Sequence, residues 1–139
     1  AAEWWKNALK LHLTSVEAKL FKSKLQEALK DKYTSHWYCD EPMRGSGYRA
    51  ILVDSQHVDT LLRNVLYATT NKSVTRTQIL IAALPRNMVM FVNPGRVSLK
   101  NLEIPNHVQN LYSTEQQVSE FTPEHVNATI VNKQQKVLV

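Results

Sequence analysis

The stretch from His36 to Val53, HWYCDEPMRGSGYRAILV, holds the residues whose types and spacing could do chemistry. His36 and Cys39 stand three residues apart, which is a half-site spacing for zinc, but a structural zinc needs four ligands and the chain has a single Cys. A nucleophilic Cys needs a lowered thiol pKa, whereas the carboxylates of Asp40 and Glu41, directly after Cys39, would raise it. The sequence therefore predicts no metal site, no cofactor and no catalytic residue in this stretch.

The two glycines of the same stretch raise the question of a phosphate-binding loop. Such a loop follows a strand and opens a helix, so that the amide groups of the helix N-terminus point at the anion. We expect YRAILV to be a strand, which places Gly45 and Gly47 before a strand and not before a helix. Both are therefore predicted to be structural, in backbone conformations that other residues disfavour. Pro94 and Gly95 are also predicted to be structural, because NPG is typical of a type II turn.

Composition narrows the class of protein. A chain of 139 residues predicts one domain. A single Cys excludes an intramolecular disulfide and favours a reducing compartment, so we expect the cytoplasm and, as a further location, the nucleus. No apolar run approaches the ~18 residues of a membrane span, and no membrane partner is expected. The net charge of +5 favours an anionic partner such as RNA. The chain opens on Ala-Ala-Glu without Met, and we expect it to be part of a longer protein.

Hydrophobic periodicity predicts the helices that must position these residues. A helix is expected over residues 2–13 and a second over 14–33, where Thr14 and Glu17 form a capping box. These two helices should form an antiparallel hairpin, since only a short turn separates them.

The remaining elements complete an α+β pattern. After the strand over 48–53, Asp59 begins a third helix, and Thr75 with Gln78 forms a second capping box for a fourth helix that Pro85 ends. Three further strands are predicted at MVMFV, RVSLK and HVQNLY. We expect helices packed on a small, mostly antiparallel sheet, which is an α+β fold.

The C-terminal segment is of a different kind. Residues 113–139 are polar and rich in Gln and Asn, and they are predicted to be an extension beyond a domain of residues 1–112. Thr122-Pro123-Glu124 is a favourable helix start, whereas ATIV and KVLV favour strands. Helical and assembly-forming extensions both remain open.

Taken whole, the stretch around the glycines resembles the first signature box of the BTG/Tob antiproliferative family, approximately Y-x-x-H-W-[FY]-P-E-x-P-x-K-G-S-G-[FY]-R-C-I. The matching residues are Tyr33, His36, Trp37, Tyr38, Glu41 (or Asp40), Pro42, Gly45, Ser46, Gly47, Tyr48, Arg49 and Ile51. Arg44 stands for the Lys, Cys39 for the first Pro and Ala50 for the Cys of that pattern. Downstream, LPRNMVMFVNPGRVSL resembles the second box, approximately L-P-x-[ED]-L-x-[VL]-W-[VI]-D-P-x-E-V-S. The departures suggest an invertebrate member, such as a nematode regulator of germ-cell sperm fate.

The resemblance implies a non-catalytic adaptor of messenger RNA repression. Members of this family bind the Caf1-type deadenylase of the Ccr4–Not complex and promote poly(A) shortening in the control of proliferation or cell fate. The deadenylase-contacting positions of the family correspond to Tyr48, Asp59, Phe91 and Asn93. Phe91 and Asn93 depart from the Trp and Asp of the family, so we expect a weakened contact.

Two alternatives come from charge and from the altered box. The domain could bind RNA directly, through basic residues on the second helix and elsewhere: Lys19, Lys22, Lys30, Arg44, Arg49 and Arg96. It could also assemble with further copies of itself as a homo-oligomer. Salt-dependent RNA binding and concentration-dependent light scattering distinguish these two from the adaptor.

Overall fold

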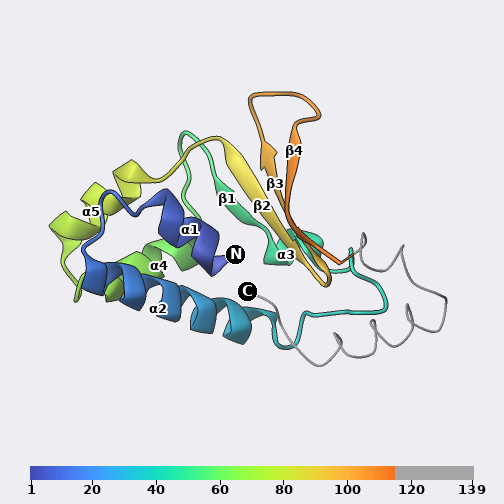
Figure 1. The fold of residues 1–139 in the computed structure, drawn as a ribbon, viewed down its shortest axis with the longest axis horizontal. Coiled ribbons are helices and arrows are strands. Elements are labelled where there is room, and N and C mark those ends of the chain that lie inside the picture. The colour runs from blue at the N-terminus through green and yellow to red at the C-terminus, as the bar shows by residue number, and fades with distance from the viewer. Residues whose placement is uncertain (115–139) are drawn as a thin grey trace. The chain divides into compact units, whose positions relative to one another are not determined.

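The computed structural model describes residues 1–114, and its chain separates into two compact units (Figure 1). The helical unit comprises residues 1–31 and 52–88. The sheet unit comprises residues 32–51 and continues from residue 89. The structure does not describe residues 115–139, so the helix and strand predictions for the extension lie outside the described residues. Along the described part of the chain, no helix has the length and apolar character needed to cross a bilayer.

The helical unit is built on α1 (Ala2–Ala8), most of α2 (Ser15–Tyr33), α4 (Thr60–Thr69) and α5 (Val74–Ala83). Each helix contributes fully buried side chains to the core of the unit, among them Trp5, Phe21, Leu25, Leu29, Leu62, Leu66 and Leu80. In α2 the buried residues recur every four positions, which places them on one face of a helix. Burial of side chains of this size stabilises a fold by about 1.5–3 kcal/mol each before the cost of chain entropy.

The structure confirms one of the two predicted capping boxes and contradicts the other. The box at the start of α2 is confirmed, because the Thr14 amide donates to Glu17 Oε1 at 3.0 Å and the Glu17 amide donates to Thr14 Oγ1 at 3.1 Å. The box at Thr75 is wrong. The helix already begins at Val74, and Ser73 is its N-cap, with Oγ accepting from the Arg76 amide at 3.2 Å.

The structure confirms two of the predicted helix boundaries and contradicts a third. Asp59 is confirmed as the N-cap of α4, and α5 ends at Ala83, just before Pro85, as predicted. The first helix was expected to continue to residue 13 but ends at Ala8. The chain has to leave the helical conformation before Thr14 can cap the next helix.

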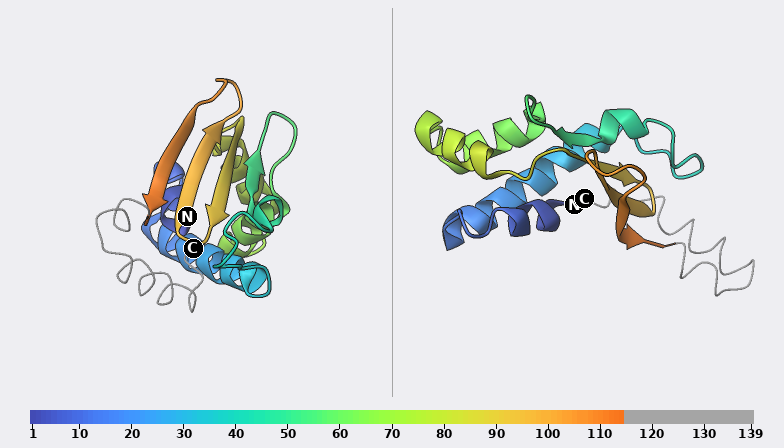
Figure 2. Two further views of the ribbon diagram at one scale, coloured as in Figure 1. Left: turned by 90° about the vertical axis from the view of Figure 1, so that its right-hand side faces the viewer. Right: turned by 90° about the horizontal axis from the view of Figure 1, so that it is seen from above.

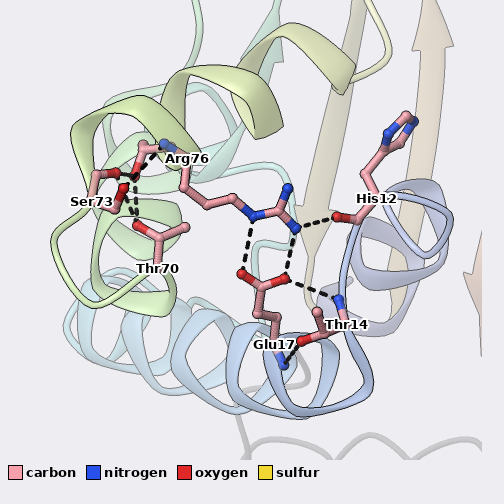
Figure 3. A network of polar contacts seen from close by, with 7 residues as sticks. His12, Thr14, Glu17, Thr70, Ser73 and Arg76 are labelled. Atoms are coloured by element: carbon pink, nitrogen blue, oxygen red, sulfur yellow. Dashed lines mark hydrogen bonds and ion pairs between the residues drawn. The ribbon is translucent and has the colours of Figure 1, made fainter.

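An ion pair joins α5 to the start of α2 inside the helical unit (Figure 3). Arg76 Nη2 lies 2.8 Å from Glu17 Oε1, and Arg76 Nε donates to Glu17 Oε2 at 3.2 Å. The same Nη2 also donates to the backbone carbonyl of His12 at 2.6 Å. The pairing lowers the pKa of Glu17 to about 2, first through the Arg76 hydrogen bond and then through the Thr14 amide. One arginine thus holds both the turn after α1 and the first turn of α2.

The sheet has four strands in the order β1 (Ile51–Val53), β2 (Met88–Asn93), β3 (Arg96–Asn101) and β4 (Val108–Ser113). β3 and β4 pair antiparallel over their length, with a register shift between Val97 and Ser98, and Figure 2 shows them side by side with β2. Gly95 has a φ of +79° in the turn between β2 and β3, which confirms its predicted structural role. Within residues 1–114, five helices and a four-stranded antiparallel sheet confirm the α+β class.

The strand predicted over 48–53 is only half correct. A short helix, α3 (Ser46–Arg49), takes up its first residues, and β1 begins at Ile51. The apolar run at the end of YRAILV does form a strand, whereas Tyr48 and Arg49 lie in the helix, where Arg49 makes hydrogen bonds to the distant residues Val92 and Asn93.

Candidate partner-binding surface

Arg49 lies fully buried in the sheet unit and donates all five of its guanidinium N–H groups to protein oxygens. Nε donates to the carbonyl of Val92 at 2.8 Å, Nη1 to those of His36 at 2.8 Å and Arg44 at 2.6 Å, and Nη2 to the carbonyl of Pro42 at 2.9 Å and to Asn93 Oδ1 at 2.9 Å. The guanidinium therefore ties the loop of residues 36–44 to the end of β2. The prediction that Arg49 contacts RNA is wrong, because a side chain with no exposed surface and no free donor cannot reach a phosphate.

Two aromatic side chains of the first signature box contact Arg49, one at its backbone carbonyl and the other at its guanidinium group. The Tyr33 hydroxyl donates to the Arg49 carbonyl at 2.6 Å. The ring of Trp37 stacks on that of Tyr33, with centroids 6.0 Å apart, and the Arg49 Cζ lies 5.5 Å from the Trp37 centroid. A cation over an indole face is favourable. In the sequence, these rings stood out only as matches to the signature box, with no sign that they contact Arg49.

The two glycines of the box play different roles. Gly45 has a φ of +74°, and a Cβ there would lie 2.9 Å from Arg49 Nη1, which confirms that it is structural. Gly47 does not have a positive φ, lies in α3, and would have nothing within 4 Å of an added Cβ. The prediction that Gly47 is structurally required is therefore wrong. A glycine that follows another at a turn need not share its conformation.

Tyr48 follows in α3 and is 48% exposed. Its ring stacks on the imidazole of His36, with centroids 4.1 Å apart and planes at 26°, and the Lys32 Nζ lies over the ring at 4.8 Å from the centroid. Because the imidazole occupies one face of the ring, the ammonium must lie over the other. The hydroxyl and the ring edge thus remain for a partner. Sequence reasoning did not identify Lys32 as part of this surface, although it lies four residues before His36.

Phe91 and Asn93 occupy alternate positions of β2, so they face the same side of the strand. Phe91 is partly exposed, whereas Asn93 is 7% exposed. The Asn93 amide accepts from Arg49 and lies 3.6 Å from the sulfur of Met43, to which its nitrogen donates. The interpretation that Asn93 itself meets a cationic group of a partner does not fit this burial, because its amide oxygen already serves the cation of Arg49.

Asp59, the fourth predicted partner contact, belongs to the helical unit. One of its carboxylate oxygens accepts from the Leu61 amide at 2.9 Å as the N-cap of α4, and its own amide donates to the Leu52 carbonyl at 3.0 Å. Its place in the structure is thus explained by capping. A contact between Asp59 and a partner stays a prediction.

The predicted RNA-binding residues do not form an isolated basic face. On α2, Lys19 and Lys30 are exposed, but Lys22 pairs with Glu3 at 2.7 Å. An acidic side chain thus already neutralises Lys22, one of the three lysines predicted to bind RNA. In the sheet unit, the Arg44 guanidinium stacks over the ring of Tyr38 at 4.2 Å, and Arg96 donates to Asn110 Oδ1 at 3.1–3.2 Å.

The residues first considered for chemistry have ordinary surroundings. Burial first, and then the charge of Asp40, raise the pKa of the Cys39 thiol, as predicted for a Cys followed by acids. His36 Nδ1 lies 3.1 Å from Ser35 Oγ. Within residues 1–114, no three His, Cys, Asp or Glu side chains are grouped so that they could hold a metal ion. The arrangement that the structure does build is an exposed aromatic residue, Tyr48, on the short helix α3, next to a loop that Arg49 holds from inside, which suits binding.

Comparison with known proteins gives relatives over most of the chain. A BTG family protein of Dictyostelium discoideum is 32% identical over 123 residues, which cover 81% of this chain and 28% of that protein. Human Protein BTG2 is 33% identical over 82 residues, 59% of this chain and 49% of that protein. Human Protein Tob2 is 30% identical over 81 residues, 58% of this chain and 22% of that protein. The chain thus matches less than half the length of each of these relatives.

A solved structure agrees with these relatives at the level of the fold. A variant of the BTG/Tob domain of C. elegans FOG-3 superposes with a TM-score of 0.65 over 86% of this chain and 90% of that one, at 18% identity. The family pattern of BTG matches residues 1–113. The resemblance seen in the two signature boxes is therefore confirmed, and the chain belongs to the BTG family.

Proposed function

We propose that this chain is a non-catalytic adaptor that recruits a Caf1-type deadenylase of the Ccr4–Not complex to messenger RNAs in the control of proliferation or cell fate. Family membership supports a regulator of the antiproliferative class. The sheet unit supplies the contact surface, and the cytoplasm is its place of action, with a further nuclear pool.

One observation carries this proposal: the Tyr48 side chain is exposed, and contacts with neighbouring residues hold its ring in place. Its neighbour Arg49 is buried and holds the loop of residues 36–44, and the Tyr48 ring itself contacts His36 and Lys32. An aromatic side chain that is already ordered loses little conformational entropy on binding. Residues of this type are the usual anchors of protein interfaces.

Titration calorimetry of the purified chain with a purified Caf1-type deadenylase tests the proposal. Tyr48→Ala should weaken binding by about 2 kcal/mol or more, as expected for an anchor. Tyr48→Phe should lose part of that energy, because His36 and Lys32 already contact the ring and the hydroxyl is left to the partner. The matched control is Tyr67→Ala, which removes a tyrosine of similar exposure (40%) on α4.

Three results bear on the proposal. No binding of the unaltered chain would contradict the adaptor function. Equal losses for Tyr48→Ala and Tyr67→Ala would contradict the placement of the surface at Tyr48. RNA binding that falls steeply with salt and that Lys19→Glu with Lys30→Glu abolishes would favour the RNA alternative, since each neutralised phosphate adds about −0.7 to the log–log slope for a single strand.

A further inference from the structure

The surroundings of Arg49 contain only neutral oxygen acceptors. Four of its five hydrogen bonds go to backbone carbonyls, and the fifth goes to the side-chain amide of Asn93. Among the residues that the structure describes, no carboxylate pairs with this guanidinium. Burial lowers the pKa of Arg49, although an arginine remains charged. A complete positive charge is thus held inside the sheet unit by neutral groups alone, the five oxygen acceptors and the face of the Trp37 ring.

Asn93 is the one side chain in this set of acceptors, and it comes from β2, whereas three of the carbonyls come from the loop of residues 36–44. A carboxylate at the same place would make a charge-assisted hydrogen bond, which is roughly twice as strong as a neutral one. Because the charge of Arg49 is already buried, its attraction would offset the cost of burying a carboxylate at position 93.

We infer that Arg49 and Asn93 are positioning residues that hold the loop of residues 36–44, and with it Tyr48, in the orientation that a partner binds. Asn93 acts through Arg49 and does not touch the partner. Because residue 93 is an amide, its hydrogen bond to Arg49 restrains the loop less firmly than the carboxylate of an aspartate would. The statement about the partner rests on the proposed function, but the statement about the loop does not.

The substitution Asn93→Asp tests the inference in the free protein. At neutral pH it should raise the melting temperature by about 4 °C or more, as expected for a gain of about 1 kcal/mol in a domain of this size. It should also slow hydrogen exchange of the amides in the loop, such as those of Glu41 and Arg44, which donate within it.

A pH series separates the charge from packing. The new carboxylate would have a lowered pKa beside Arg49, so its stabilisation is present above the ordinary value of about 3.9 and is lost as the pH falls through the lowered one. The other titratable groups that act on Arg49 are the tyrosines Tyr33 and Tyr38, and no carboxylate is among them. The difference in melting temperature between Asn93→Asp and the unaltered chain should therefore vanish in acid.

Asn110→Asp is the matched control. Asn110 also accepts from an arginine, Arg96, at 3.1–3.2 Å, but this pair is exposed. The same change of chemistry should therefore leave the melting temperature nearly unchanged, because water and salt screen an exposed pair. Arg49→Lys provides a second variant, since a lysine has three donors in place of five. If it folds, exchange in the loop should become faster and deadenylase binding should weaken at least tenfold.

The outcomes separate the inference from the proposed function. The whole inference is supported if Asn93→Asp, and not Asn110→Asp, raises the melting temperature, slows hydrogen exchange in the loop and tightens deadenylase binding. An unchanged free protein overturns it, and if binding also changes, Asn93 is a direct contact. If the unaltered chain does not bind the deadenylase, the proposed function fails, while the effects on the free loop still decide whether Arg49 and Asn93 position it.

Discussion

At the scale of single residues, Gly45 meets two separate requirements. Its φ of +74° is disfavoured for residues with a side chain, and the space that a Cβ would take is occupied by the Arg49 guanidinium at 2.9 Å. Two residues later, Gly47 meets neither. A short glycine motif can therefore contain one essential and one replaceable position.

This difference predicts opposite effects of the same substitution. Gly45→Ala should destabilise the protein by roughly 1–3 kcal/mol, because it combines backbone strain with a close contact. Gly47→Ala, its control, should be neutral or stabilise by roughly 0.4–1 kcal/mol, since Ala restricts the unfolded chain and fits a helix. Urea denaturation of both variants measures the effect, and equal losses would contradict the difference in their surroundings.

At the scale of elements, Glu17 joins two tasks at the start of α2. It closes the capping box with Thr14 and pairs with Arg76 of α5. Its side chain is 18% exposed, so water screens the pair only in part. Local capping and tertiary docking of two helices thus depend on one carboxylate.

Glu17→Gln removes the charge and keeps an oxygen that can accept from the Thr14 amide. We expect a loss of roughly 1–2 kcal/mol at pH 7, discounted because the Arg76 side chain is one-third exposed. The pKa of Glu17 is lowered from 4.5 to about 2 in the folded state, so its stabilisation is complete above pH 4.5 and is lost as the pH falls towards 2. The stabilities of the two proteins should converge over that interval.

Glu3→Gln is the control for this prediction. The pKa of Glu3 is also lowered to about 2, by Lys22 first and then Lys6, but its side chain is 51% exposed. Its loss should be smaller and should shrink further with added salt. Denaturation midpoints at several pH values and two salt concentrations measure both variants. A larger effect at Glu3 than at Glu17 would show that burial does not set the strength of these pairs.

At the scale of the whole molecule, the departures from the family pattern act in two ways. Phe91 is partly exposed and could meet a partner directly, whereas Asn93 is buried against Arg49. The same two changes looked alike in the sequence, as two weakened contacts. The structure divides them into a surface change and an internal one.

Restoring the family residues should therefore strengthen deadenylase binding in two distinguishable steps. Phe91→Trp with Asn93→Asp should tighten binding by about 1–3 kcal/mol, through a larger contact and a firmer loop. Only the second substitution should raise the stability of the free protein. Tyr67→Trp, a tryptophan added on α4, controls for unspecific adhesion. Calorimetry that finds an unchanged dissociation constant for the double variant would exclude these positions from the binding of that partner.

The sequence by itself determined the features whose physics is local. The capping box of Thr14, the N-cap at Asp59 and the turn at Gly95 each involve residues that lie within a few positions of one another, so pattern and spacing predict them. With these local features, the sequence also predicted the α+β class and the family.

Only the tertiary structure decided what the buried polar groups do. Arg49 reaches acceptors 43 and 44 residues away, and Arg76 reaches Glu17 across 59 residues. An arginine in a basic chain suggests a surface charge, and nothing in its neighbours along the sequence reveals that folding encloses it. The fate of such a group depends on which distant oxygens the fold brings within hydrogen-bond distance, because burial of a charge is tolerated only where those oxygens satisfy it.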